Sequence, residues 1–143
     1  DPAGRARELP AMIDAVTTHK TDFFREPAHF EHLRKLVLPA LAATSARRPL
    51  RFWSAGCASG EEPYSLAMVL SEHQERHPGF DFEILATDIS PAVLRKAQRA
   101  VYAEERIEPV PEACRRRYLL RSKDRSRRLV RIAPGLRARV RFR

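Results

Sequence analysis

One stretch of the chain, RFWSAGCASGEEPYSLAM at residues 51–68, indicates the fold. Its start, joined to Leu50, is a short apolar run typical of a buried strand. A loop of small residues follows at 55–60, and Glu61-Glu62-Pro63 then opens a helix whose apolar side chains recur as far as Leu70. A buried strand that runs through a small-residue loop into a helix is the first half of a βαβ unit.

The second half of that unit follows at residues 82–87, FEILAT, which indicate another buried strand, closed by Asp88. Ser90 and Pro91 suit the N-cap and the first turn of a helix. The apolar side chains expected on that helix are Val93, Leu94, Ala97 and Val101. Strand, loop, helix, strand, acidic residue and helix, in this order, predict an α/β fold with a parallel sheet.

Two helices are predicted ahead of this unit. Residues 9–16, LPAMIDAV, indicate a short apolar helix that polar residues end. Pro27 suits the first turn of an amphipathic helix that ends near residues 42–46. Residues 47–49 then form a linker to the first strand.

The residues after the unit indicate short strands. Tyr118–Leu120 and Leu129–Ile132 predict an antiparallel hairpin around a polar turn at 122–128. Val140–Phe142 resembles the beginning of another strand. Two or three parallel strands do not close a doubly wound sheet, whose centre is buried on both faces. We therefore expect the chain to be the incomplete first half of a longer domain.

The composition is that of a globular protein, because 43% of the 143 residues are hydrophobic and 31% are charged. No apolar run approaches the roughly 18 residues of a membrane-spanning helix. Cys57 and Cys114 lack the spacing of a CxxC pair or of a metal site. We interpret both as reduced thiols of a cytosolic protein.

The net charge of +9 is distributed unevenly along the chain. Residues 112–143 carry 13 Lys and Arg against 2 Asp and Glu, a net charge of +11, whereas residues 1–111 carry −2. Such a block is typical of a surface for an anionic partner, and equally of a solvated face in an arginine-rich protein. Within residues 112–143, only Tyr118 and Phe142 supply the aromatic side chains that a single-strand binder uses.

The loop and the acidic residue that follow the two strands are candidates for ligand binding. Gly56 and Gly60 are spaced as GxxxG, which is neither the dinucleotide fingerprint nor a P-loop, and a plain βα turn has the same composition. Asp88 is placed to accept both hydroxyls of a ribose, or to cap the next helix, for which Ser90 is an equal candidate. Loop and carboxylate together indicate an adenosine ligand without a pyrophosphate, of which S-adenosylmethionine is the common example.

A polar segment at residues 17–25 precedes the sheet. The planar guanidinium of Arg25 can clamp a carboxylate, although a surface arginine without a specific contact has the same signature. His29 and His32 lack carboxylate partners and indicate a helix surface, so no metal site is predicted.

Three segments resemble the CheR family of chemotaxis-receptor glutamate methyltransferases: TTHKTDFFREPAHF (17–30), RFWSAGCASGEEPYSLAM (51–68) and ATDISPAVLRKAQRAVY (86–102). The GEEPYS run combined with an upstream T-x-FFR is the specific part of the likeness. RRYLLR and the closing VRFR also resemble the family, so the likeness covers nearly the whole chain from about residue 12.

The resemblance implies a class I methyltransferase with a Rossmann-like parallel sheet and a small inserted antiparallel subdomain. Its implied reaction is the transfer of a methyl group from S-adenosylmethionine to glutamate side chains of chemoreceptors. Arg25 is the implied catalytic residue, close to the reacting centre, and His19 stands where the family often has Asn. The implied cofactor-binding residues are His19, Thr21, Arg25, Ser54, Gly56, Glu62 and Asp88.

The resemblance also implies a domain organisation and partners. Residues 1–16 are the remnant of an amino-terminal or linker helix, 17–111 the cofactor-binding core, 112–139 the antiparallel subdomain and 140–143 the start of the next core strand. The expected partners are methyl-accepting receptors, including a receptor C-terminal peptide at residues 117–139, with no nucleic acid and no membrane insertion. The expected location is cytoplasmic. The alternative is a basic nucleic-acid-binding module or a non-catalytic protein-interaction module.

Overall fold

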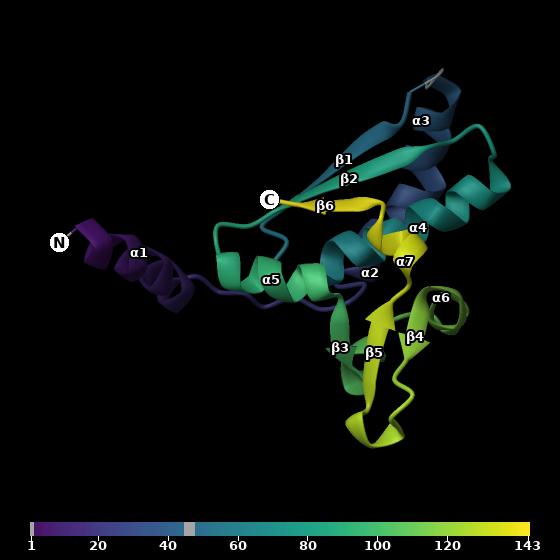
Figure 1. The fold of residues 1–143 in the computed structure, drawn as a ribbon. Coiled ribbons are helices and arrows are strands. Elements are labelled where there is room, and N and C mark those ends of the chain that lie inside the picture. The colour runs from purple at the N-terminus through teal and green to yellow at the C-terminus, as the bar shows by residue number, and fades with distance from the viewer. Residues whose placement is uncertain (1, 45–47) are drawn as a thin grey trace.

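The computed structural model describes residues 2–44 and 48–143 (Figure 1). Its centre is a parallel sheet in the order β1-β2-β6, formed by Leu50–Ala55 (β1), Phe82–Thr87 (β2) and Val140–Phe142 (β6). The register pairs Leu50 with Phe82 and Ile84 with Val140. The predicted α/β class, the parallel pairing of the first two strands and the further strand at 140–142 are therefore confirmed.

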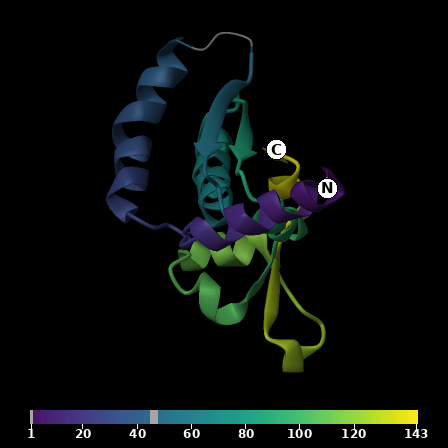
Figure 2. The same ribbon diagram turned by 90° about the vertical axis from the view of Figure 1, so that its left-hand side faces the viewer.

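The helices before and between the strands are α1 (Pro2–Val16), α2 (Pro27–His32), the π-helical η1 (Leu33–Val37), α3 (Leu38–Thr44), α4 (Glu61–Arg76) and α5 (Pro91–Arg99). The segment from α2 to α3 is continuous and stands beside the sheet in Figure 2, as the amphipathic pattern from Pro27 predicts. Residue 1 and residues 45–47, which hold the predicted end of this helix and the start of the linker, lie outside the described residues.

The first helix is longer than its apolar pattern indicates. The prediction covers 9–16, whereas α1 begins at Pro2 and includes Pro10. The additional residues, PAGRARE, give no apolar periodicity, but alanine, arginine and glutamate are strong helix formers and proline suits a first turn. In Figure 1 the helix extends away from the sheet and only its C-terminal end approaches α5.

A second sheet, antiparallel and in the order β3-β5-β4, projects below the first in Figure 1. Its strands and accompanying helices are β3 (Val101–Ala103), η2 (Glu104–Ile107), α6 (Glu112–Tyr118), β4 (Leu119–Arg121), η3 (Arg125–Arg127) and β5 (Leu129–Ile132). A short helix, α7 (Pro134–Arg137), leads from it to β6. The predicted β4–β5 hairpin is confirmed. Residues 101–133 are called the antiparallel unit below.

The expectation that Val101 continues the preceding helix is wrong. Ala100 adopts a left-handed conformation, with φ of 54°, and its N–H bonds back to the carbonyl oxygens of Lys96 and Ala97. This C-cap ends α5 and turns the chain into β3, which pairs with β5. The helical spacing of Val101 is thus a coincidence, since tertiary pairing with β5 decides its conformation.

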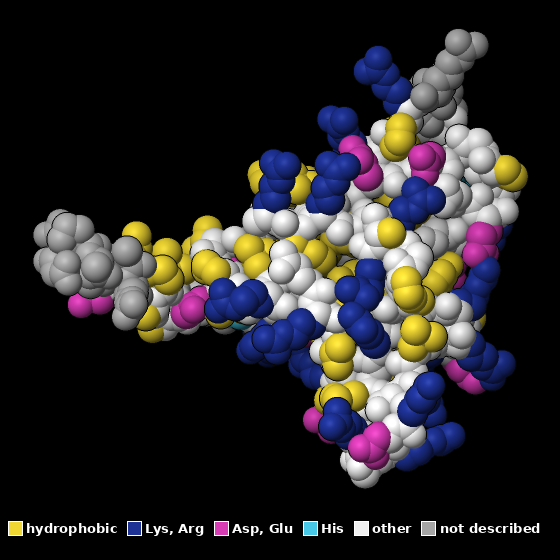
Figure 3. All heavy atoms as spheres, in the orientation of Figure 1, with side chains coloured by type: hydrophobic (Ala, Val, Ile, Leu, Met, Phe, Trp, Pro, Cys, Tyr) yellow, Lys and Arg dark blue, Asp and Glu magenta, His cyan; other side chains and the backbone are white. Residues whose placement is uncertain are grey.

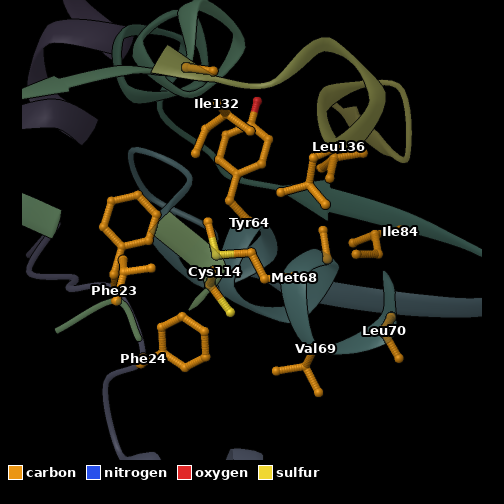
Figure 4. Packing of buried hydrophobic residues seen from close by; sticks show 14 of the residues in the cluster. Phe23, Phe24, Tyr64, Met68, Val69, Leu70, Ile84, Cys114, Ile132 and Leu136 are labelled. Carbon is orange, nitrogen blue, oxygen red and sulfur yellow. The ribbon is translucent and has the colours of Figure 1, made fainter. Parts of the chain in front are cut away.

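The core lies around α4, between the two sheets (Figure 4). Met68 and Leu70 are fully buried in it. The Tyr64 side chain reaches α5, where its hydroxyl donates to the Ala97 carbonyl oxygen at 2.9 Å. Burying a side chain of this size contributes roughly 1.5–3 kcal/mol. Because α4 is held on both sides, its N-terminus is fixed against the ends of β1 and β2.

The other face of the parallel sheet is open in the described part of the chain. Trp53 is 69% exposed there and Leu85 is also exposed. Arg51 pairs with Glu83 at 2.6 Å across the strands, and Arg141 approaches the same carboxylate at 3.8 Å. Lys and Arg side chains are spread over the face of the molecule shown in Figure 3, on the sheet and on the antiparallel unit.

Candidate cofactor-binding and active site

The loop after β1 and the acidic residue after β2 meet at one edge of the sheet. Ala55 and Thr87 are register partners, so both strands end together. The Cys57 N–H donates to the Thr87 carbonyl oxygen at 2.9 Å and draws the loop over the end of β2. Asp88 follows directly. The carboxyl edge of a parallel sheet is where α/β proteins bind their ligands.

The carboxylate of Asp88 is fixed by backbone donors. Its Oδ2 accepts from the Ala58 N–H and its Oδ1 from the Ser90 N–H, both at 2.9 Å. Ser90, not Asp88, is the N-cap of α5, because its Oγ accepts from the Val93 N–H at 3.3 Å. An ionised carboxylate has about four lone-pair positions, so about two remain for ligand hydroxyls.

The two glycines of the loop have different tasks. Gly60 has φ of 97°, and a Cβ there would lie 2.9 Å from both the Tyr102 hydroxyl and the Ala97 Cβ. It is required for close packing between α4, α5 and β3. Gly56, with φ of 69°, has no atom within 4 Å of an added Cβ. Its backbone therefore stands open to a ligand.

Two adjoining cavities lie along this edge. The larger, of about 410 Å³, is lined by Thr17, Thr18, His19, Lys20, Gly56, Ala58, Thr87, Asp88 and Ile89. The smaller, of about 130 Å³, is lined by Lys20, Thr21, Asp22, Arg25, Phe30, Gly56 and Glu62. Gly56 and Lys20 belong to both. The two cavities thus form one elongated cleft with Asp88 at one end and Glu62 with Arg25 at the other.

The end of the cleft near Glu62 contains hydrogen-bonded polar groups. The buried Ser54 hydroxyl donates to Glu62 Oε1 at 2.5 Å. Arg25 is exposed, and its Nη1 donates to the Lys20 carbonyl oxygen at 2.9 Å. In the larger cavity, His19 Nε2 lies 2.7 Å from the Thr17 hydroxyl. An accepting carboxylate therefore stands within the same small cavity as a guanidinium.

Glu61 and Glu62 are neighbours in sequence but not in environment. Glu61 is 2% exposed and its carboxylate contacts Arg106 Nη2 at 2.8 Å and the Ser59 hydroxyl at 2.7 Å. Glu61 is thus paired within the protein, with the guanidinium of Arg106. Of the two carboxylates that the sequence places at the helix start, only that of Glu62 lines the cleft.

The structure brings the predicted site residues together. Six of them line the cleft: His19, Thr21, Arg25, Gly56, Glu62 and Asp88. Ser54 does not line it but bonds to Glu62 from beneath. Their functional roles stay predictions. Lys20 and Thr17, which also line the cleft, carry no local signal that would have singled them out.

The cysteines lie buried and unpaired. Burial, aided by the nearby Asp88 carboxylate, raises the pKa of the Cys57 thiol to about 12. Burial and a hydrogen bond to Glu72 raise the pKa of Cys114 to about 12 as well. Both thiols are protonated at neutral pH, so neither is an activated nucleophile, although Cys57 belongs to the loop of the cleft.

Within residues 2–44 and 48–143, no group of three or more His, Cys, Asp or Glu side chains is arranged to hold a metal ion. In the same residues, no helix has the length and apolar character needed to cross a membrane.

Comparison with known proteins gives a consistent result. Residues 19–143 match the family model described as CheR methyltransferase, SAM binding domain. A chemotaxis protein methyltransferase of Borreliella burgdorferi is 43% identical over 121 residues, which are 82% of this chain and 43% of that protein. The chemotaxis protein methyltransferase 2 of Pseudomonas aeruginosa is 39% identical over 138 residues, 95% of this chain and 47% of that protein.

The matches cover only part of each relative. The chemotaxis protein methyltransferase 2 of Vibrio cholerae is 35% identical over 94% of this chain but only 46% of its own length. The chain thus spans about half the length of the curated relatives it matches. The matched residues include all those that line the cleft except Thr17 and Thr18, and the description of the family model names S-adenosylmethionine as the ligand. The chain belongs to the CheR methyltransferase family and matches the model of its S-adenosylmethionine-binding domain over residues 19–143.

Proposed function

We propose that the protein transfers a methyl group from S-adenosylmethionine to glutamate side chains of chemoreceptors, forming methyl esters. The observation that carries this proposal is the convergence of Asp88, Glu62 and Arg25 on one cleft around the open backbone of Gly56. Each group has a counterpart of suitable chemistry in the cofactor or the substrate.

The residues of the cleft fit the cofactor end to end. Asp88 keeps about two lone-pair positions for the two ribose hydroxyls, and backbone N–H groups hold the carboxylate in place. Glu62, oriented by Ser54, offers a carboxylate for the amino group at the other end. His19 lines the part of the cleft that holds Asp88, and Thr21 lines the part that holds Glu62 and Arg25. Gly56 lets the ligand approach the chain closely between them.

The chemistry requires positioning more than proton transfer. S-adenosylmethionine, when bound, supplies an electrophilic methyl carbon on a positively charged sulfur. A glutamate carboxylate has an ordinary pKa of about 4.3 and is already a nucleophile at neutral pH. The protein needs no general base, and its contribution is to align the reacting groups, which is worth roughly 7–11 kcal/mol.

Arg25 is the residue proposed to orient the substrate carboxylate. One of its five N–H donors is used by the Lys20 carbonyl oxygen, which leaves four for a partner. A bidentate pair would draw electron density from the attacking oxygen. We therefore assign a single hydrogen bond from Arg25 to the carboxylate oxygen that does not react.

The strands of the antiparallel unit form the proposed docking surface for a receptor C-terminal peptide. In the described residues its outer strands β3 and β4 each pair only with β5, so both present an edge that an extended peptide can join. Arg131 lies between Val101 and Leu120 in the register, and both apolar side chains are exposed. This row offers a cation for a peptide carboxylate and apolar surface for its side chains.

A cytoplasmic location is part of the same proposal. Two unpaired thiols are typical of a reducing compartment.

The first test is calorimetric titration of the full-length protein with S-adenosylhomocysteine, the product of the cofactor. We expect saturable 1:1 binding, and an affinity on the order of 100-fold lower in Asp88→Asn, because a hydrogen bond to a charged group is worth about 1.5–3 kcal/mol. Asp124→Asn is the matched control. Its Oδ1 accepts from the Ser126 N–H at 3.0 Å, as that of Asp88 does from Ser90 N–H at 2.9 Å.

The second test follows a labelled methyl group from S-adenosylmethionine to purified receptor. Label released as methanol by mild base identifies a methyl ester. A folded full-length protein that does not bind S-adenosylhomocysteine contradicts the whole proposal. Binding without transfer to receptor glutamates would keep the cofactor site and contradict the substrate.

A further inference from the structure

Among the residues that the structure describes, Arg106 is the only charged side chain of the antiparallel unit that contacts the polar segment 17–25. It lies on η2, directly after β3. Its Nη2 donates to the Thr21 carbonyl oxygen at 2.7 Å and to Glu61 Oε1 at 2.8 Å. Its Nη1 lies 3.1 Å from Asp22 Oδ1. One guanidinium thus joins two elements of the cleft: the segment that carries Thr21 and the first turn of α4.

The anchor at Glu61 is rigid because its carboxylate is buried. A buried carboxylate without a partner is strongly unfavourable, so separating Arg106 from Glu61 is costly in free energy. The hydrogen bond that Arg106 donates to Glu61, aided by the charges of Glu61 and Asp22, raises the pKa of Arg106 above its ordinary value. The planar fork of arginine reaches several acceptors at fixed angles, which the single ammonium of lysine cannot do.

The segment has a second anchor after Asp22. Phe23 is fully buried and meets the Tyr102 ring edge-on at 4.9 Å. The Phe24 N–H donates to the Ser65 hydroxyl at 2.9 Å. Phe24 and Glu26 both have positive φ, 51° and 55°, so the backbone is bent sharply on either side of Arg25. The contacts of Phe23 and Phe24 fix the segment after Asp22, and Arg106 fixes it at Thr21 and Asp22.

We infer that Arg106 is a positioning residue for methyl transfer, which ties residues 20–22 to α4 and so holds at the cleft both Thr21 and the guanidinium of Arg25, which bonds to the Lys20 carbonyl oxygen. The inference rests on the proposed function, since it assigns the positions of Thr21 and Arg25 a role in the reaction. Arg106 itself lines neither cavity of the cleft and acts through the segment.

The test compares Arg106→Lys with Arg116→Lys in the full-length protein. The lysine at 106 keeps a cation for Glu61 but cannot also reach Thr21 and Asp22. Arg116 pairs with Glu112 on the surface of α6, away from the cleft, and is the matched control. If Arg106→Lys does not fold, the double variant Arg106→Gln with Glu61→Gln removes both buried charges together and takes its place.

Two readouts are expected to change at position 106 and not at 116. Amides of residues 17–25 exchange hydrogen faster, whereas those of α4 keep the wild-type rate. The kcat for receptor methylation, counted per S-adenosylhomocysteine site, falls by on the order of 100-fold through misalignment. The KM for the receptor stays unchanged, because Arg106 lies on η2 and not on the strands proposed to dock the receptor peptide.

The outcomes separate this inference from the proposed function. Unchanged exchange at 17–25 and unchanged kcat in Arg106→Lys overturn the positioning role and leave the methyltransferase proposal intact. Faster exchange throughout α4 assigns Arg106 to general stability and also overturns it. A wild-type protein that neither binds S-adenosylhomocysteine nor methylates receptor overturns the proposed function, and with it the reaction that Arg106 would serve.

Discussion

The cofactor cleft and the antiparallel unit differ in how their polar groups are held. In the cleft, Asp88 is fixed by two backbone N–H groups and Glu62 by the buried Ser54 hydroxyl. On the antiparallel unit, Leu120 is 52% exposed beside Arg131, and strand edges are open in the described residues. Fixed groups suit a small ligand of defined shape, whereas an open edge suits an extended peptide.

The two regions also differ in charge. The antiparallel unit, residues 101–133, carries 10 Lys and Arg against 5 Asp and Glu, a net charge of +5, whereas residues 1–100, which contain every residue that lines the cleft, have a net charge of zero. A sulfonium cofactor would meet carboxylates in the cleft, and an acidic receptor segment would meet arginines on the antiparallel unit. The charge block that suggested nucleic-acid binding is thus equally suited to an anionic protein partner.

The largest effect is expected from Gly60→Ala, which disturbs the packing of the cleft loop against the antiparallel unit. The new Cβ would press on Tyr102 of β3 and on Ala97, and a positive φ adds backbone strain. We expect the free energy of unfolding to fall by about 3 kcal/mol. Gly56→Ala, in the same loop but in open space, should cost about 1 kcal/mol. Urea unfolding of both variants checks this, and equal losses would contradict the packing role of Gly60.

A smaller effect is expected from Leu120→Asp, which tests whether the two regions bind independently. Losing the apolar contact of a docked leucine should weaken binding of a receptor C-terminal peptide by about 2 kcal/mol, or roughly 30-fold. The affinity for S-adenosylhomocysteine should not change. Leu36→Asp, at an exposed leucine on η1, is the control. An unchanged peptide affinity in Leu120→Asp would contradict the proposed docking surface.

The smallest effect concerns what the two regions share: each has a buried thiol with a pKa raised from 9.0 to about 12, Cys57 and Cys114. The folded state binds the thiol proton more tightly than the unfolded state. The stability from each thiol is therefore complete below pH 9 and is lost as the pH rises from 9 to 12.

Between pH 8 and pH 10, each thiol should remove about 1 kcal/mol from the free energy of unfolding. Cys57→Ala and Cys114→Ala should each lessen this fall by the same amount when unfolding is measured at both pH values. A fall that matches the wild type in either variant would show that its thiol ionises as freely in the folded protein as in the unfolded one.

The sheet and its site were predictable because their signals are local. A buried strand, a small-residue loop and a capped helix each leave a pattern within a few residues, and Ser90 is indeed the N-cap of α5. The likeness to a known family then indicated which residues line the cleft. Strand β3 was missed because Ala100 ends the helix in a left-handed conformation that alanine seldom adopts.

The sequence by itself determined the parallel α/β core, the hairpin and the family, since hydrophobic periodicity and motif residues are properties of the chain alone. Only the tertiary structure decided which of two adjacent glutamates lines the cleft and which of two glycines is needed for packing. Glu61 and Glu62 differ because the side of α4 that each occupies meets a different neighbour. Arg106 resembles any other arginine in sequence, because its role depends on partners that are 45 to 85 residues away along the chain.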